Sequence, residues 1–410
     1  MYRASLLFAL LASPVVISAQ ENDDEWKATS RKEILQRERE KKADNLEPYE
    51  VSESEKRLLG WEKKKFPQNW LVKGWRGFRP VFGGMPSGSG TVIGGGYIHG
   101  LEAQYFQLQA NARFSTRGYT TADAELVLPP PQIGRRVELK FRAEYRDLTA
   151  LSFFGIGNDS SRENESSFLL NDQSATAYLW LNPRGLLSLG VQGGFLTSDA
   201  DRGTHAPSIE EVFPPEQVPG SDALRTDYIV TGGWIEFDIR DKWAEPPVGF
   251  VARVTAVRYE DTKLDEFDFT RVVADIKGYI SLGTRNRILA LRLRTSHSID
   301  DDDDQVPFYL METLGGAKTI RAYDEFRFRD ARNLYVSAEY RWEVWPLVDF
   351  SFFFDAGKVF DDLDDFNFDK MHTGYGAGLR IHTPGGMAFR MDVARSTEGY
   401  KLHISGGPTF

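Results

Sequence analysis

Charged and apolar side chains alternate strictly along residues 136–146, and this period of two constrains the fold more than any other feature of the chain. The charged positions are Arg136, Glu138, Lys140, Arg142, Glu144 and Arg146, and the apolar positions between them are Val137, Leu139, Phe141, Ala143 and Tyr145. Successive side chains of a β-strand lie on opposite faces. A soluble sheet buries its apolar face in a core, whereas a membrane barrel turns that face to lipid and the charges to a wet lumen.

The same alternation recurs from Arg76 to the end of the chain and predicts sixteen strands. We expect them at about 76–84, 88–99, 103–115, 118–129, 135–149, 174–183, 185–198, 225–239, 248–261, 267–283, 286–299, 333–345, 348–360, 372–383, 386–396 and 400–410. If the first strand rises from the periplasm, the long connections at 150–173, 199–224, 300–332 and 361–371 all fall on the external side. Membrane barrels follow this rule, and a β-sandwich has no reason to do so. The sequence therefore predicts a 16-stranded antiparallel transmembrane β-barrel over residues 76–410.

The residues before the barrel divide into two segments. Residues 1–19 have the pattern of a secretory signal peptide, with Arg3 as the positive start, an apolar stretch, and small residues at the cleavage site after Ala19. Residues 20–75 are dense in both charge signs and poor in apolar residues. This composition indicates a charged periplasmic leader, partly helical or disordered, with a partner-docking helix as the less favoured interpretation.

The composition also narrows the classes of function. The chain has no cysteine, which excludes disulfides, thiolate metal sites and a cysteine nucleophile. Its net charge of -10 argues against nucleic-acid binding. The carboxylates at 300–304 could hold Ca²⁺, but they lack the ligand spacing of a known site and are more typical of a solvated charge run. We expect no catalytic residues, no metal and no cofactor, and therefore no enzyme.

Residues 307–360 contain a series of short motifs in a distinctive order. Leu314-Gly315-Gly316 is followed by Ile320-Arg321-Ala322-Tyr323, then by Glu339-Tyr340-Arg341 and Phe353-Phe354-Asp355-Ala356-Gly357. This order and spacing resemble the BamA/TamA superfamily of outer-membrane assembly factors, also called bacterial surface antigens. Residues 153–159 and 374–394 resemble the third external loop and the last hairpin of that family. Our strand count places Arg321 on the sixth external loop, where the family carries its conserved motif.

The resemblance implies a site inside the barrel, because the sixth loop of this family folds into the lumen. Arg321 would there meet Glu339 and Asp355, and the alternation independently turns both acids inward. An arginine fork can bind such carboxylates bidentately. The motif residues expected to belong to this site are Gly315, Gly316, Ile320 and Tyr323 on the loop, with Phe353 and Gly357 on the strand. Ala322 stands where the family usually has glycine, and a positive φ there would strain it.

The resemblance also suggests where and how the protein works. We expect a barrel of the bacterial outer membrane without the family's POTRA modules, inserted by means of a C-terminal signal ending in Phe410. It would contact outer-membrane lipids and lipopolysaccharide, but no nucleic acid. It would act in outer-membrane assembly or in translocation of protein or lipid, with unfolded outer-membrane or secreted proteins as partners. Because Pro80, Gly83 and Gly84 lie in the expected first strand, the barrel would close weakly there. A passive channel, or a structural or surface-antigen barrel, is the alternative.

Overall fold

The computed structural model describes residues 75–405 except for 87, 101–104, 130–135, 184, 206, 223–224, 242–247, 301–303, 346–347 and 384–385. The expected signal peptide, the expected leader up to residue 74, and Phe410 lie outside the described residues. Across the described residues, no helix combines the length and apolar character needed to cross a membrane.

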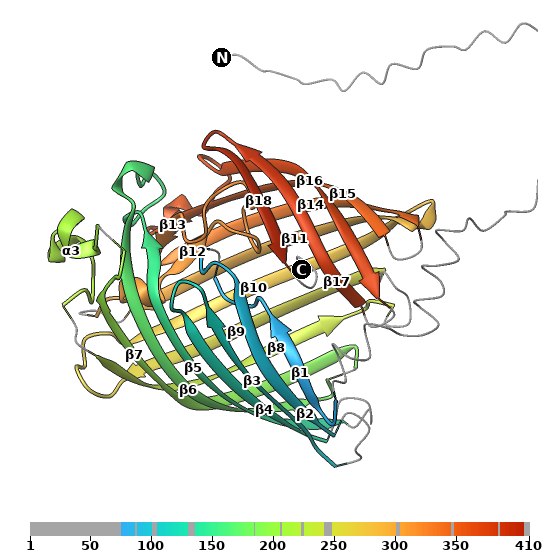
Figure 1. Ribbon diagram of the computed structural model, residues 1–410, viewed down its shortest axis with the longest axis horizontal. Helices are drawn as coiled ribbons and strands as arrows, with labels where there is room; N and C mark the ends of the chain where they lie inside the picture. The colour runs from blue at the N-terminus through green and yellow to red at the C-terminus, as the bar shows by residue number, and fades with distance from the viewer. Residues whose placement is uncertain are drawn as a thin grey trace, which may run out of the picture. The chain divides into compact units, whose positions relative to one another are not determined.

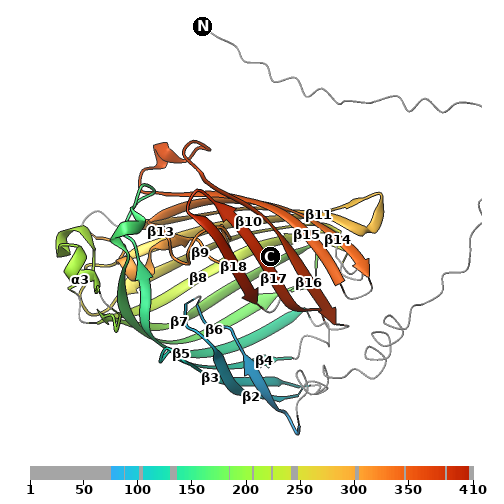
Figure 2. The same cartoon turned by 45° about the horizontal axis from the view of Figure 1, so that its top comes forward.

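The expected sixteen-stranded antiparallel sheet is confirmed, and its strands pair in the order of the chain. The strands are β1 (Phe78–Phe82), β2 (Val92–His99), β3 (Gln107–Ser115), β4 (Thr120–Leu128), β5 (Val137–Phe153), β6 (Ser166–Leu181), β7 (Leu187–Arg202), β8 (Thr226–Asp238), β9 (Gly249–Asp261), β10 (Phe269–Leu282), β11 (Thr284–Asp300), β14 (Arg332–Trp345), β15 (Val348–Phe360), β16 (His372–Thr383), β17 (Gly386–Ser396) and β18 (Gly399–Ser405). The sheet curls around a lumen to form a barrel (Figures 1 and 2).

Outward and lumenal side chains alternate along the strands, as the period of two predicted. On β15, Phe350, Phe352 and Phe354 are 45%, 57% and 47% exposed, whereas the residues between them at 351, 353 and 355 are at most 5% exposed. The apolar row thus covers the outside of the barrel, and the inward row faces the lumen. This arrangement is the one expected where lipid surrounds the wall and polar groups collect inside.

The two ends of the barrel differ in their connections. The long connections at 154–165, 203–225, 301–331 and 361–371 all lie at one end, which we call the loop end, and the opposite end is the turn end. The short helices of the described residues are confined to loop-end connections (Figure 1). They are α3 (Ile209–Val212) and single 3-10 turns at Arg162–Asn164, Pro215–Gln217, Phe308–Leu310 and Leu363–Asp365.

The β5–β6 hairpin rises further at the loop end than the sequence pattern predicted, because β6 begins at Ser166 and not near 174. The added residues pack into an apolar cluster in which the Phe308 ring lies 5.6 Å from that of Phe153 and 4.9 Å from that of Phe168. Residues of α3 and of the 203–225 connection join this cluster. Burial of these apolar side chains stabilises strands that extend beyond the wall, and residues 166–173 do not alternate in a way that could reveal it.

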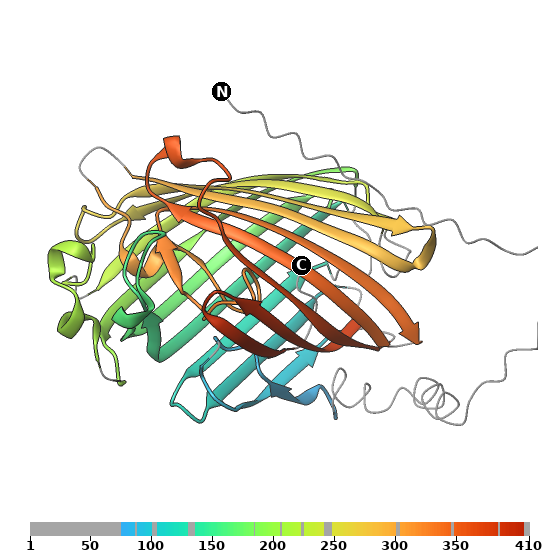
Figure 3. The same ribbon diagram turned by 90° about the horizontal axis from the view of Figure 1, so that it is seen from above.

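β1 and β18 are the two ends of the sheet, and we call the boundary between them the seam. Within the described residues no hydrogen bond joins these two strands. β1 has five residues, and β18 has seven up to Ser405. A strand that crosses a bilayer needs about 9–11 residues, so β1 is shorter than a spanning strand requires. Figure 3 shows the N-terminal strands in blue and the C-terminal strands in red on either side of it.

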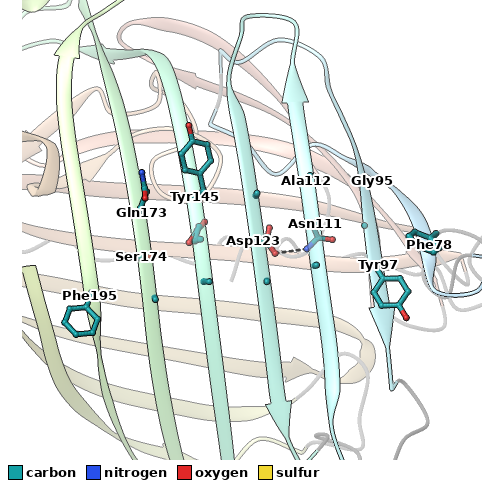
Figure 4. A pocket seen from close by; sticks show the side chains of 17 residues that line it. Phe78, Gly95, Tyr97, Asn111, Ala112, Asp123, Tyr145, Gln173, Ser174 and Phe195 are labelled. Carbon is teal, nitrogen blue, oxygen red and sulfur yellow. Dashed lines mark hydrogen bonds between the residues drawn. The ribbon is translucent and has the colours of Figure 1, made fainter. Parts of the chain in front are cut away.

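The outer face of the wall is hollowed beside the seam. Small residues occupy outward positions over β2 to β6, namely Gly95, Ala110, Ala112, Ala122, Ala124, Ala143 and Ala175. Larger rings, including Phe78, Tyr97 and Phe195, border the resulting cavity of about 870 Å³ (Figure 4). Asn111 and Asp123 alternate with the small residues along their strands and are joined by a hydrogen bond of 2.7 Å (Figure 4).

Candidate functional site in the lumen

The β11–β14 connection is the sixth loop of the sequence analysis, and its described part, residues 304–331, folds back into the lumen. It contains a small hairpin that the pattern did not predict, formed by β12 (Glu312–Leu314) and β13 (Phe328–Asp330). Gly315 and Gly316 follow β12 with φ angles of 114° and 83°, which only glycine adopts readily. A Cβ on Gly315 would lie 2.0 Å from the carbonyl oxygen of Asp324, so this turn also requires the absence of a side chain.

The turn delivers Arg321 to the middle of the wall, where the structure brings it together with Glu339 of β14 and Asp355 of β15. The Arg321 Nε and Nη2 groups donate to the two carboxylate oxygens of Asp355 at 2.8 and 2.9 Å, and Nη1 donates to Glu339 Oε2 at 2.6 Å. The backbone N–H of Arg321 also donates to Asp355 at 3.2 Å. All three side chains are fully buried. This is the bidentate geometry in which a charged arginine is held most specifically.

Two further buried charges belong to the cluster, and the sequence analysis did not identify them. Arg380 of β16 contacts Glu339 at 3.1 Å and Asp392 of β17 at 2.6 Å. Asp392 in turn lies 3.7 Å from Arg321. Both residues occupy lumenal positions in the 374–394 hairpin, so the alternation could have placed them inward. We call these five residues, Arg321, Glu339, Asp355, Arg380 and Asp392, the lumenal arginine site.

An aromatic ring packs against the guanidinium group of Arg321. The guanidinium carbon of Arg321 lies 3.4 Å from the ring centroid of Phe353, which is a cation–π contact inside a desolvated site. A Cβ on Gly376 would lie 2.5 Å from the Phe353 ring, so glycine at 376 provides the space that the ring occupies. Within the motif, Phe353 thus provides the ring that contacts Arg321, because its side chain faces the lumen whereas its neighbours on β15 face outward.

The sequence left open whether a positive φ strains the backbone at Ala322, and the structure shows no such strain. Within the described residues, positive φ outside glycine occurs at Arg76, Asn182, Asp265, Phe326 and Lys370, and not at Ala322. The methyl group of Ala322 is fully buried and packs against β16, where a Cβ on Gly374 would lie 2.4 Å from it. The alanine is therefore accommodated by a glycine on the facing strand.

The remaining motif residues pack the loop against the wall. Ile320 is fully buried and Tyr323 is 2% exposed, and both belong to one apolar cluster with residues of β14 and β15. A Cβ on Gly357 would lie 3.1 Å from Ile320 and 2.9 Å from Leu314, so glycine at 357 allows this close approach. The Tyr323 ring also contacts the ring of His372 at 5.7 Å.

The loop is also bound to the last strand, which forms one side of the seam. The Nε2–H of His403 donates to the carbonyl oxygen of Arg321 at 2.7 Å. The ammonium group of Lys401 pairs with Asp324. These contacts link the lumenal arginine site to β18 from the inside of the barrel.

Asp330, in the β13 segment of the loop, provides a test by pH. Burial raises the pKa of this carboxyl to about 6. The hydrogen bond that it accepts from the Ala331 N–H lowers the pKa, but this effect is weaker. A raised folded pKa contributes stability below the unfolded pKa of about 3.9, and this contribution is lost as pH rises through 6. We expect Asp330→Asn to raise the melting temperature at pH 8 and to have little effect at pH 4, measured by circular dichroism in detergent. An equal shift at both pH values would contradict this assignment.

These observations define a transmembrane β-barrel whose lumen holds an inserted loop, pinned by a buried arginine. Residues 92–410 match the Omp85 superfamily domain, and the chain belongs to this superfamily. The expected relationship to the BamA/TamA barrels is thereby confirmed.

Solved structures agree with this assignment at the level of the fold. BamA from Haemophilus ducreyi, in a form lacking POTRA domains 1–3, has 16% sequence identity and a TM-score of 0.56, with 81% of this chain and 69% of that chain covered. CdiB from Escherichia coli has 13% identity and a TM-score of 0.52, with 80% and 62% covered, so this chain spans less than two thirds of CdiB. No curated protein matches the chain in sequence.

Proposed function

We propose that this protein is a barrel of the bacterial outer membrane that assists the insertion or translocation of other proteins, and that it binds an extended segment of its substrate at the β1 edge of the seam. The observation that carries the proposal is the asymmetry of the seam. His403 and Lys401 hold β18 to the loop in the lumen, whereas β1 pairs only with β2 among the described strands. An unpaired edge offers a row of backbone donors and acceptors to an incoming strand.

The wall beside the seam supports a second part of the proposal, which concerns lipid. β1 to β4 have only five, eight, nine and nine residues, compared with 17 in β5. A wall with a short apolar span is accommodated by local thinning of the bilayer. Thinner lipid beside the free edge would ease the passage of a strand into the membrane. The partners are therefore outer-membrane lipids, including lipopolysaccharide, together with unfolded outer-membrane or secreted proteins.

Locking the seam tests the proposal. The purified barrel is inserted into liposomes, and the folding rate of a second, unfolded barrel protein is measured. The chain has no cysteine, so the pair Phe82→Cys on β1 and Leu402→Cys on β18, both on the outer face of the wall, can be joined selectively by oxidation or by a short bis-maleimide. We expect the wild-type barrel to accelerate folding and the cross-linked barrel to lose this acceleration. Reduction of the disulfide form restores it.

A matched cross-link elsewhere in the wall provides the control. Leu179 of β6 and Val191 of β7 are register partners in strands that are already paired. Joining Leu179→Cys to Val191→Cys should leave the acceleration unchanged, because this part of the wall does not open. Full activity of the barrel with a locked seam would rule out the seam as the working edge.

The packed loop end disfavours the passive channel. The apolar cluster of Phe153, Phe168 and Phe308 draws residues from three loop-end connections together. We therefore expect no large, steady conductance in planar bilayers. Steady conductance that is independent of Arg321, together with no acceleration of folding, would favour the channel or a structural or surface-antigen barrel.

A further inference from the structure

Three aromatic side chains face the lumen near the turn end, which is an unusual place for them. Tyr178 and Trp180 of β6 lie beside Trp234 of β8, with ring centroids 6.2 and 5.8 Å from that of Trp234. Their strand partners are the lumenal charged residues Lys140 and Glu138 of β5, so these rings point inward. Aromatic residues near the ends of barrel strands usually face the membrane interface. This cluster is separate from the lumenal arginine site.

The arrangement of the cluster depends on particular neighbours. A Cβ on Gly190 of β7 would lie 2.0 Å from the Trp234 ring, so the ring lies directly on the backbone of β7. The guanidinium carbon of Arg253 lies 5.1 Å from the Trp180 centroid and 5.7 Å from that of Trp234. Glu236 holds this guanidinium at 2.6 Å. These contacts pack Trp234 against β7 and place both tryptophan rings beside the same guanidinium group.

The cluster borders a cavity of about 140 Å³, which equals the liquid volume of about five water molecules. Trp234 is only 8% exposed, and the indole N–H groups of Trp180 and Trp234 are buried without a hydrogen-bond acceptor in the described part of the chain. A buried indole N–H normally has an acceptor. Two such donors on the wall of one cavity point to a ligand that supplies acceptor oxygens.

The charges around the cavity favour a neutral ligand. Arg253 is paired with Glu236, and Lys140 lies 3.5 Å from Glu125. Glu138 also lines the cavity, so no excess of positive charge remains to select an anion. The other polar groups in the lining, including the side-chain amide of Gln192, can both donate and accept.

The wall argues against an extended polypeptide. Each strand from β5 to β9 is paired on both sides, so a peptide backbone finds no free edge there. A compact cavity with aromatic walls, fixed donors and mixed polar groups instead suits a small ring that carries several hydroxyl groups. We propose that this turn-end cavity binds a neutral saccharide ring, whose hydroxyl oxygens accept hydrogen bonds from the indole N–H groups of Trp180 and Trp234. The proposal does not rest on the function proposed above.

Direct binding tests this inference. The full barrel is kept in a zwitterionic detergent without sugar headgroups, and maltotriose, chitotriose and a blocked trialanine peptide are titrated in turn. Saturation-transfer NMR and calorimetry report binding. We expect one or both saccharides to bind, and Trp234→Phe and Trp180→Phe each to weaken binding roughly tenfold, the scale of one lost hydrogen bond. Both variants keep an aromatic ring, and heat-modifiable migration on gels checks their folding.

A tryptophan on the outer face serves as the matched control. Trp342 of β14 is 38% exposed and lies on the outside of the wall, so Trp342→Phe should leave saccharide binding unchanged. Gly190→Ala should weaken binding as well, because the added methyl group displaces the Trp234 ring. Absence of binding by both saccharides, or equal binding by both lumenal tryptophan variants and wild type, would overturn the proposal. Tighter binding of the peptide would assign the cavity to polypeptide instead.

Discussion

Replacing Arg321 with alanine is expected to destabilise the barrel by about 3–5 kcal/mol and to release the sixth loop from the lumen. The substitution removes both side-chain hydrogen bonds that hold the fully buried Asp355 to arginine. Glu339 loses its contact with Arg321 at 2.6 Å but keeps those with Arg380 and Arg341. A buried carboxylate that loses its partner keeps the cost of desolvation without compensation. Thermal unfolding measures the loss of stability, and protease cleavage within 301–331 measures the release of the loop.

The matched control is another lumenal arginine. Arg142 is 43% exposed and lies 3.3 Å from Glu144, so Arg142→Ala should change stability by about 1 kcal/mol at most. Arg321→Lys should fall between these results, because lysine keeps the charge but lacks the planar fork. If Arg321→Ala were as stable and as protease-resistant as Arg142→Ala, the buried contacts would not be what holds the loop.

A methyl group on Gly374 is expected to displace the loop, and removal of the methyl group of Ala322 is expected to restore its position. The two methyl carbons would lie 2.4 Å apart, and no side-chain rotation relieves the clash because each is attached directly to the backbone. Overpacking of this kind costs about 1–3 kcal/mol. The double variant Gly374→Ala with Ala322→Gly should recover most of that loss. The unfolding free energies of the wild type, the two single variants and the double variant give the coupling.

Gly278 on β10 provides the control for this cycle. A Cβ at that position meets nothing within 4 Å, so Gly278→Ala should be close to neutral both alone and combined with Ala322→Gly. Simple additivity of the Gly374 and Ala322 substitutions would mean that the two residues do not touch in the working protein.

The seam shows how far local sequence could lead. Pro80 and the glycines after it indicated a weak first strand, and β1 is indeed only five residues long. The local sequence could not predict in the same way that His403 and Lys401 hold β18. Alternation turns these two residues inward, but it does not say which part of a distant loop they will meet.

The lumenal arginine site was likewise predicted only in part from the sequence. The alternation and the motif order brought Arg321, Glu339 and Asp355 to attention, because the side chains of a strand have only two faces. The same alternation places Arg380 and Asp392 inward. Many other charged residues also face inward, however, and the alternation does not say which of them form ion pairs. The space that Gly374 leaves for Ala322 is a contact between residues 52 positions apart in the numbering. The sequence raised only the question of strain from a positive φ at Ala322, whereas the feature that accommodates its methyl group lies on a facing strand.

The sequence by itself determined that the chain forms a sixteen-stranded barrel, which residues face outward, and which connections are long. These properties follow from periodicity and turn chemistry, which act between near neighbours along the chain. The tertiary structure alone decided how the buried charges pair, which strand of the seam is held, and where Trp180 and Trp234 enclose a cavity. Those outcomes depend on the register and curvature of the wall, which bring together residues that no local pattern connects.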